Sequence, residues 1–196
     1  MEWIERIVEA TGWPHEAEDL GWEQEEAELG LVLPADFKEL DRRFGAGALS
    51  GVISLLRPSA VDGETRLISM WATQRQVEGS GEIGARMYAP YGVYEPGGGR
   101  PGLLEWGYDL GEGEYYWLVD RAVPAERWPV LARRDDGGWH RYDMQASEFL
   151  YRVLADPGFE PFGIADPPRV AFYLPPGEFI SSAEEWAARS DPRRRS

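Results

Sequence analysis

Few residues in this chain could carry out chemistry, apart from a large number of acids. It has 35 aspartate and glutamate residues, two histidines, His15 and His140, and no cysteine. The lack of cysteine excludes disulfides, thiolate zinc sites, iron–sulfur clusters and cysteine nucleophiles. Two histidines argue against a zinc or iron site built from an imidazole cluster. A magnesium or calcium site made of carboxylates alone stays open, but we predict no metal, no cofactor and no catalytic residue.

The sequence motifs of common enzyme classes are absent or stand in the wrong context. There is no G-x-S-x-G motif, and His140 falls in a predicted strand, where an ordinary half-exposed histidine is far more common than a catalytic base. Gly45-Ala46-Gly47 looks like part of a dinucleotide fingerprint, but it follows a predicted helix instead of opening one. We expect a tight helix-to-strand turn there. Gly97-Gly98-Gly99-Arg100 is followed by no G-K-[ST] helix and predicts a flexible loop.

Aromatic side chains are abundant, with nine tryptophans and nine tyrosines. Such side chains could line a sugar-binding or base-stacking surface, but large aromatic residues more often fill a core. We expect inward positions for Trp3, Trp22, Trp106, Trp117 and Trp139.

The formal net charge of −15 opposes binding to nucleic acid or to an anionic membrane, because both require basic side chains. It favours a basic partner instead. Between residues 1 and 41 there are thirteen acidic residues and two basic ones, so most of the imbalance lies in the first fifth of the chain. A solvated helical surface would also account for this charge. The sequence shows neither a membrane-spanning stretch nor a secretory signal, and we expect a cytoplasmic protein.

The N-terminal part predicts three helices. Residues 2–11 carry apolar residues at helical spacing, and a second helix is expected at about 19–29, with Asp19 as a possible cap and Gly30 at its end. The clearest helix runs from Pro34 to Phe44, since its apolar residues fall on one face and its charged residues on the other.

After Gly45 the pattern changes to short apolar runs that predict strands. The predicted strands are Val52–Leu56, Arg66–Ala72, Leu103–Leu110, Tyr115–Val119, Pro129–Arg133 and Trp139–Tyr142. Glycine-containing turns at 110–113 and 135–138 predict two hairpins, and Tyr115–Val119 is apolar on both faces, as in a central strand. The glycine-rich stretch 79–102 predicts one long surface loop, inserted into the sheet region.

A last core helix is expected from Asp143 to Leu154, after which 156–196 reads as a Pro-rich extension. This extension is expected to hold a short helix, capped at Ser181-Ser182-Ala183-Glu184, and a frayed tail at 193–195. The order of elements predicts an α+β domain at 1–155, with an antiparallel or mixed sheet flanked by the N-terminal helices and one C-terminal helix.

Three groups of residues, in this order, resemble the SUKH superfamily of Smi/Knr-type regulators and bacterial immunity proteins. The first is Trp22, Glu25, Glu26, Leu29-Gly30, Leu33-Pro34, Asp36-Phe37-Lys38 and Leu40, in which L-G-x-x-L-P is the core signature. The second is Trp106-Gly107-Tyr108-Asp109, Gly111, Gly113, Tyr115-Tyr116-Trp117-Leu118 and Asp120. The third is Pro129-Val130 with Ser147, Phe149 and Leu150. The resemblance covers about residues 20–155, whereas the loop 79–102 looks like an insertion and 156–196 has no counterpart.

The resemblance implies a non-enzymatic immunity protein that binds and neutralises a toxin domain, often a nuclease. A nuclease carries a basic cleft, and an acidic inhibitor presents a complementary electrostatic field. The acids expected to contact such a partner are Glu23, Glu25, Glu26, Glu28, Asp109, Glu112 and Glu114.

Two alternatives remain open on the sequence. One is a regulatory scaffold of the Smi/Knr kind that binds several cellular proteins. The other is a carbohydrate- or nucleotide-binding enzyme that uses the aromatic residues and scattered carboxylates. The sequence does not decide the identity of a toxin, the oligomeric state, or the roles of 79–102 and 156–196.

Overall fold

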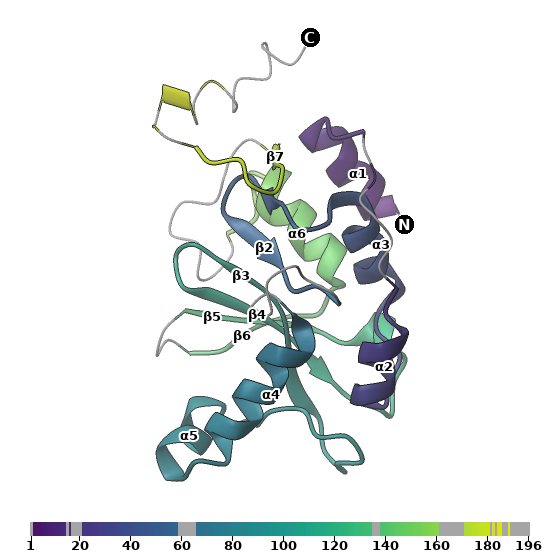
Figure 1. Ribbon diagram of the computed structural model, residues 1–196, viewed down its shortest axis with the longest axis vertical. Helices are drawn as coiled ribbons and strands as arrows, with labels where there is room; N and C mark the ends of the chain where they lie inside the picture. Colours follow the sequence, from purple (N-terminus) through teal and green to yellow (C-terminus); the bar gives the residue numbers. More distant parts are fainter. Residues whose placement is uncertain are drawn as a thin grey trace.

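The chain folds around a seven-stranded antiparallel sheet with helices on both faces (Figure 1). The computed structural model describes residues 2–14, 16, 21–58, 66–134, 138–160, 171–180, 182, 184, 185 and 188. The strands are β1 Ala48–Leu49, β2 Ile53–Leu55, β3 Gly102–Asp109, β4 Gly113–Val119, β5 Val130–Arg134, β6 His140–Tyr142 and β7 Tyr173–Leu174. The helices are α1 Glu2–Thr11, α2 Glu23–Leu29, α3 Ala35–Phe44, α4 Leu67–Glu78, α5 Glu82–Met87 and α6 Ala146–Ala155, with a short 3₁₀ helix at Ala125–Arg127. The predicted α+β class is confirmed.

The helices α1, α3 and α6 lie together on one face of the sheet (Figure 1). Helix α3 begins directly after Pro34, whose fixed φ suits a helix start, and it ends at Gly45 with a φ of +62°. Its apolar face is buried, and the ring of Phe37 makes an edge-to-face contact with Trp117 at 4.7 Å between centroids. The predicted helix and the tight turn that follows it are both confirmed.

The pair β3–β4 forms the middle of the sheet and is buried on both faces. In β4, Tyr115 and Trp117 face the α1–α3–α6 layer, whereas Tyr116 belongs to a second, smaller apolar cluster. In β3, Trp106 and Leu103 divide between the two faces in the same way. This alternation follows from the period of two in a strand. The prediction of a central strand at Tyr115–Val119 is confirmed.

Helix α4 and residues 88–93 cover the second face, whereas α5 packs against α4, and this differs from two predictions. The strand predicted at Arg66–Ala72 is wrong, because residues 67–72 form the first part of α4. The apolar run hid the helical period, since Leu67 packs into the larger core while Trp71 reaches both apolar clusters. The loop predicted at 79–102 is only partly correct, because α5 forms within it and Tyr94 N–H donates to the Leu103 carbonyl at 2.8 Å.

The C-terminal extension contributes an edge strand, although its sequence reads as an appendage. Strand β7 pairs antiparallel with β1, matching Leu49 with Tyr173. Residues 171–174 are buried. The extension therefore belongs to the core at this point. The sequence gives no local signal for it, because the paired strands are far apart in the chain.

The Tyr173 hydroxyl fastens β7 to the end of α3. It accepts a hydrogen bond from Gly47 N–H at 2.9 Å and donates one to the Phe44 carbonyl. A Cβ at Gly47 would collide with this hydroxyl and with the Leu174 carbonyl, so the close approach requires glycine.

The remaining predictions are mostly confirmed within the described residues. The helix at 2–11, the β3–β4 hairpin, the strands at β2, β5 and β6 and the last core helix are all present, with ends that differ by a few residues. Ser182 Oγ accepts the Glu185 N–H, as in a helix cap. Asp19, His15, residues 135–137 of the second hairpin turn, Ser181, Ala183 and the tail at 193–195 lie outside the described residues. No helix of the described part is long and apolar enough to cross a membrane.

We expect Tyr173→Phe to lower the free energy of unfolding by about 1–3 kcal/mol, because it leaves the buried Gly47 N–H and Phe44 carbonyl without their partner. Urea denaturation followed by tryptophan fluorescence would measure this. Tyr108→Phe, at a half-buried tyrosine of β3, is the matched control. Equal midpoints for the two variants would contradict the structural role given to the Tyr173 hydroxyl.

Candidate functional site

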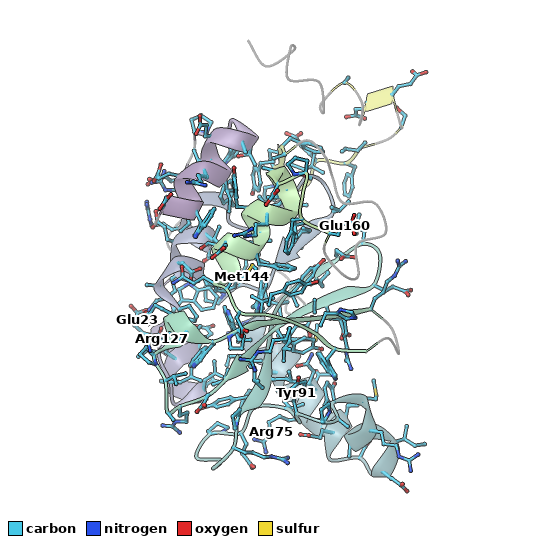
Figure 2. The ribbon with its side chains drawn as sticks, turned by 180° about the vertical axis from the view of Figure 1, so that it is seen from behind. Glu23, Arg75, Tyr91, Arg127, Met144 and Glu160 are labelled. Atoms are coloured by element: carbon cyan, nitrogen blue, oxygen red, sulfur yellow. The ribbon has the colours of Figure 1, made fainter. Side chains whose placement is uncertain are left out.

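The acids predicted on α2 divide into two pairs. Glu23 and Glu28 are exposed, and Figure 2 shows Glu23 at the periphery of the molecule. Glu25 is buried, and burial raises the pKa of its carboxyl above the ordinary value even though Arg66 lies 3.7 Å away. Glu26 accepts the Leu33 N–H at 2.9 Å and a hydrogen bond from Lys38 Nζ at 2.7 Å. Glu25 is therefore not available as a surface contact, because its carboxylate serves the interior of the fold.

The acids predicted around the β3–β4 turn also have different positions. Asp109 is buried, and its carboxylate accepts the N–H groups of Gly111 and Gly113 and the hydroxyl of Tyr115. Glu114 pairs with Arg133 at 2.5 Å, and Glu112 is exposed at the tip of the turn. The prediction of a surface role is wrong for Asp109, whose three accepted hydrogen bonds build the turn itself.

The structure does not bring the predicted acids into one patch. Helix α2 and the β3–β4 turn lie on opposite sides of the molecule (Figure 1). The roles of Glu23, Glu28 and Glu112 in binding a partner stay a prediction.

A polar network that the sequence analysis missed lies between α4 and the sheet. Its central residue is Glu105, a β3 side chain that is only 4% exposed. Gln74 of α4 donates to the Glu105 carboxyl and also contacts the Tyr116 hydroxyl at 3.2 Å, and that hydroxyl in turn donates to Glu114 at 2.9 Å. Burial, together with the negative charge of Glu114, raises the pKa of Glu105 to about 8. The carboxyl is thus held largely in its neutral form at neutral pH.

The hydrogen bonding of Gln74 agrees with a neutral Glu105. The Gln74 side-chain oxygen is buried and has no partner among the described residues. A protonated carboxyl carries one O–H donor, and a carboxylate carries none. With the Gln74 amide turned by 180°, so that its oxygen takes the place of the nitrogen that contacts Glu105 here, the neutral acid would supply that donor.

Arg133 anchors the other side of this network. Its guanidinium lies over three aromatic rings, with 4.6 Å to the centroid of Trp139, 5.3 Å to Tyr88 and 5.6 Å to Tyr116. It also donates to the Met87 carbonyl at the end of α5. Arg133 therefore joins the sheet to the segment that covers it.

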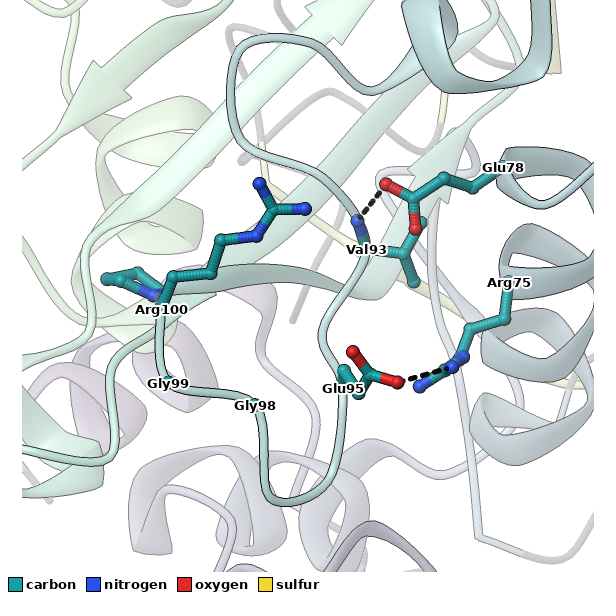
Figure 3. Close-up of a pocket in the computed structure, with 8 residues that line it drawn as sticks. Arg75, Glu78, Val93, Glu95, Gly98, Gly99 and Arg100 are labelled. Atoms are coloured by element: carbon teal, nitrogen blue, oxygen red, sulfur yellow. Dashed lines mark hydrogen bonds and ion pairs between the residues drawn. The ribbon is translucent and has the colours of Figure 1, made fainter. Parts of the chain in front are cut away.

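A shallow pocket of about 360 Å³ opens between α4 and the glycine-rich loop (Figure 3). Most of its charged groups are already engaged: Arg75 donates to Glu95 at 3.0 Å, and Glu78 accepts the Val93 N–H at 3.1 Å. Arg100 lies across from Glu78 without an ion pair in the described part of the chain. Two cations and two acids leave the pocket without a net charge to select a ligand.

Within the described residues, no group of three or more His, Asp or Glu side chains could hold a metal ion. His140 lies half-buried in the edge strand β6, as the sequence predicted. His15 lies outside the described residues.

Comparison with known proteins gives no relative. No family model, curated protein or solved structure matches this chain. The resemblance to the SUKH superfamily therefore rests on the sequence motifs alone and stays a prediction.

A signal for Glu105 and Arg133 did exist in the sequence. Glu105 interrupts the run Leu103-Leu104-Glu105-Trp106, and Arg133 ends the apolar run of β5. An acid in a strand that is buried on both faces needs a partner from a covering element. That element is α4, whose first part was predicted as the strand Arg66–Ala72, so the partner, Gln74, could not be named.

We expect Glu105→Gln to change how stability depends on pH. The raised pKa means that the folded state retains a proton that the unfolded chain releases above about pH 4.5. The wild type should therefore lose roughly 1 kcal/mol of stability per pH unit between about 4.5 and about 8 from this group, and the glutamine variant should not. Urea titrations across this range would measure the difference, with Glu82→Gln on exposed α5 as control. Parallel curves for wild type and Glu105→Gln would contradict a neutral Glu105.

We expect Arg133→Met to destabilise the protein by about 2–4 kcal/mol and to loosen α5 first, because the Met87 carbonyl loses its donor and Glu114 its cation. Relative to the wild type, amide hydrogen exchange in the variant should become faster in α5 and residues 88–94 by more than it does in α1 and α6. Arg141→Met, at an exposed ion pair, is the control. Equal protection of α5 in both variants would show that Arg133 does not anchor it.

Proposed function

We propose that this chain is a non-enzymatic protein-binding module for a basic partner, and that it acts as an immunity protein against a nuclease-type toxin. The first part is supported by how the charges are distributed in the fold. The toxin is supported by the SUKH resemblance.

The observation that carries the proposal is that most cations are held in ion pairs within the chain. Eleven of the fifteen described lysine and arginine side chains pair with a carboxylate: Arg6, Lys38, Arg42, Arg43, Arg57, Arg66, Arg75, Arg86, Arg133, Arg141 and Arg152. Meanwhile Glu9, Glu23 and Glu28 are exposed, with no cation in ion-pair distance among the described residues. The outward field is therefore negative, which speeds association with a basic surface and repels nucleic acid.

The pairing also explains why composition overstates the acidic surface. Arg42 and Arg43 form ion pairs with Glu5, Glu16 and Glu39 in the N-terminal region and offset two of their three negative charges. The side-chain hydrogen bond from Arg42 lowers the pKa of Glu39. The exposed acids that remain are fewer, and they are the ones a partner can reach.

We expect the tagged chain to retain a basic protein from lysate of its source cells at about 0.05 M salt and to release it at about 0.5 M, because salt screens exposed charges. Mass spectrometry would identify the retained protein. One basic nuclease-like partner would support immunity, and several signalling or envelope proteins would favour the regulatory scaffold. Saturable binding of a small molecule with no protein partner would favour the enzyme alternative and overturn the proposal.

A charge-reversed variant tests whether the predicted acids carry the interaction. Glu23→Lys, Glu28→Lys and Glu112→Lys together should reduce the retained partner roughly tenfold more than the same three reversals at Glu82, Asp143 and Glu160, which are also exposed. Undiminished capture by the first variant would refute the electrostatic part of the proposal.

A further inference from the structure

Two turns at one end of the sheet share an uncommon backbone feature. Among the described residues other than glycine, only Ser50 and Glu112 have a positive φ, at 52° and 64°. Ser50 lies in the β1–β2 turn and Glu112 in the β3–β4 turn. The turns are joined, because Leu110 N–H donates to the Val52 carbonyl at 3.1 Å. Strained backbone persists only where its surroundings hold it, and it is concentrated at functional sites.

The surroundings hold both turns firmly. The Asp109 carboxylate accepts two backbone N–H groups of the β3–β4 turn and the Tyr115 hydroxyl. Ser50 is fully buried, and its N–H donates to the Phe172 carbonyl at 2.7 Å. Side chains displayed here are thus ordered before any partner arrives, which reduces the entropy lost on binding.

What these turns display is apolar. Leu110 is 75% exposed at the tip of the β3–β4 turn, and Val52 beside it is partly exposed. The segment after β7 reaches the same place, because Ile180 Cδ1 lies 3.1 Å from where a Cβ of Gly51 would be, and its neighbour Phe179 is 82% exposed. We call Val52, Leu110, Phe179 and Ile180 the tip surface.

The charges around the tip surface point to the kind of partner. Glu112 and Glu178 are exposed beside its apolar side chains, and one cation, Arg134, lies near Gly111, so the net charge of this rim is negative, in a chain of net charge −15. A second copy of the chain would bring the same negative charge to the contact, which disfavours self-association. An apolar anchor with an acidic rim complements an apolar pocket with a basic rim.

We propose that the tip surface is where the chain docks on its basic protein partner, with Leu110 as an anchor that inserts into an apolar pocket of that partner. This inference rests on the proposed function and adds the surface that the acids alone do not define. Another exposed apolar pair, Ile83 and Met87, lies on α5, where Glu82 and Arg86 neutralise each other, while Val32 and Val123 are exposed singly. That helix therefore offers no matching charge selectivity, and it provides a control.

The test selects binders to the full chain from a displayed library of a small folded domain with randomised surface positions. Enriched clones should be basic with apolar residues at their centre. They should bind Leu110→Ser at least roughly tenfold more weakly than wild type, and Ile83→Ser like wild type. Since the chain has no cysteine, an environment-sensitive dye on Leu110→Cys should also shift to the blue with these clones, and the same dye on Ile83→Cys should not.

Other outcomes would contradict the tip surface, the proposed function or the kind of partner. Suppose that basic clones bind the Leu110→Ser variant normally but no longer bind the double variant Glu23→Lys/Glu28→Lys. The partner would then not dock on the tip surface, and the proposed function would still stand. Clones without basic character, bound independently of salt, would remove the proposed function as well. A dimer in sedimentation equilibrium that Leu110→Ser abolishes would show that the occupant is a second copy.

Discussion

Burial of the β3–β4 pair on both faces is the constraint on which the rest of the structure depends. A strand pair in the middle of a seven-stranded sheet must be covered twice, so one helical layer is not enough. The layer of α1, α3 and α6 covers the face that carries Trp106 and Trp117, and the long connection between β2 and β3 covers the other face with α4 and residues 88–93. Residues 88–93, a part of the stretch that looked like an insertion, therefore belong to this layer.

The second layer is held by polar contacts as much as by apolar ones. Its apolar cluster is small, and Glu105, Tyr116 and Arg133 lie within the same interface. Buried polar groups in this interface need hydrogen-bond partners, because the desolvation penalty of an unpaired group would exceed the stabilisation from the apolar contacts. The neutral state of Glu105 and the aromatic surroundings of Arg133 are two solutions to that requirement. On the outside, most of the described cations are held in ion pairs and the excess negative charge faces solvent.

The sequence allowed the α+β class, most strands and the best helices to be predicted, since each has a local signature. Helix α3 shows its Pro34 start and Gly45 end, and β4 shows its apolar run. Helix α4 and strand β7 were not predicted, because their environments are set by distant residues. Helix α4 packs against both apolar clusters, and β7 pairs with Leu49, far back in the chain. For the candidate contacts, composition located the acids but could not tell the buried Glu25 and Asp109 from the exposed Glu23 and Glu112.

The order of the strands also bears on how the chain reaches this fold. Six of the seven strands meet neighbours that are adjacent in sequence, so their pairing closes short loops or the single helical excursion between β2 and β3. Strand β7 instead closes a loop from Leu49 to Tyr173, and loop closure becomes less favourable as a loop lengthens. Pairing between strands that are adjacent in sequence is expected to form faster than the long-range pairing of β7. We expect the β1 edge, like the contact of α1 with α6, to be covered late in folding, and until then this edge can pair with another chain.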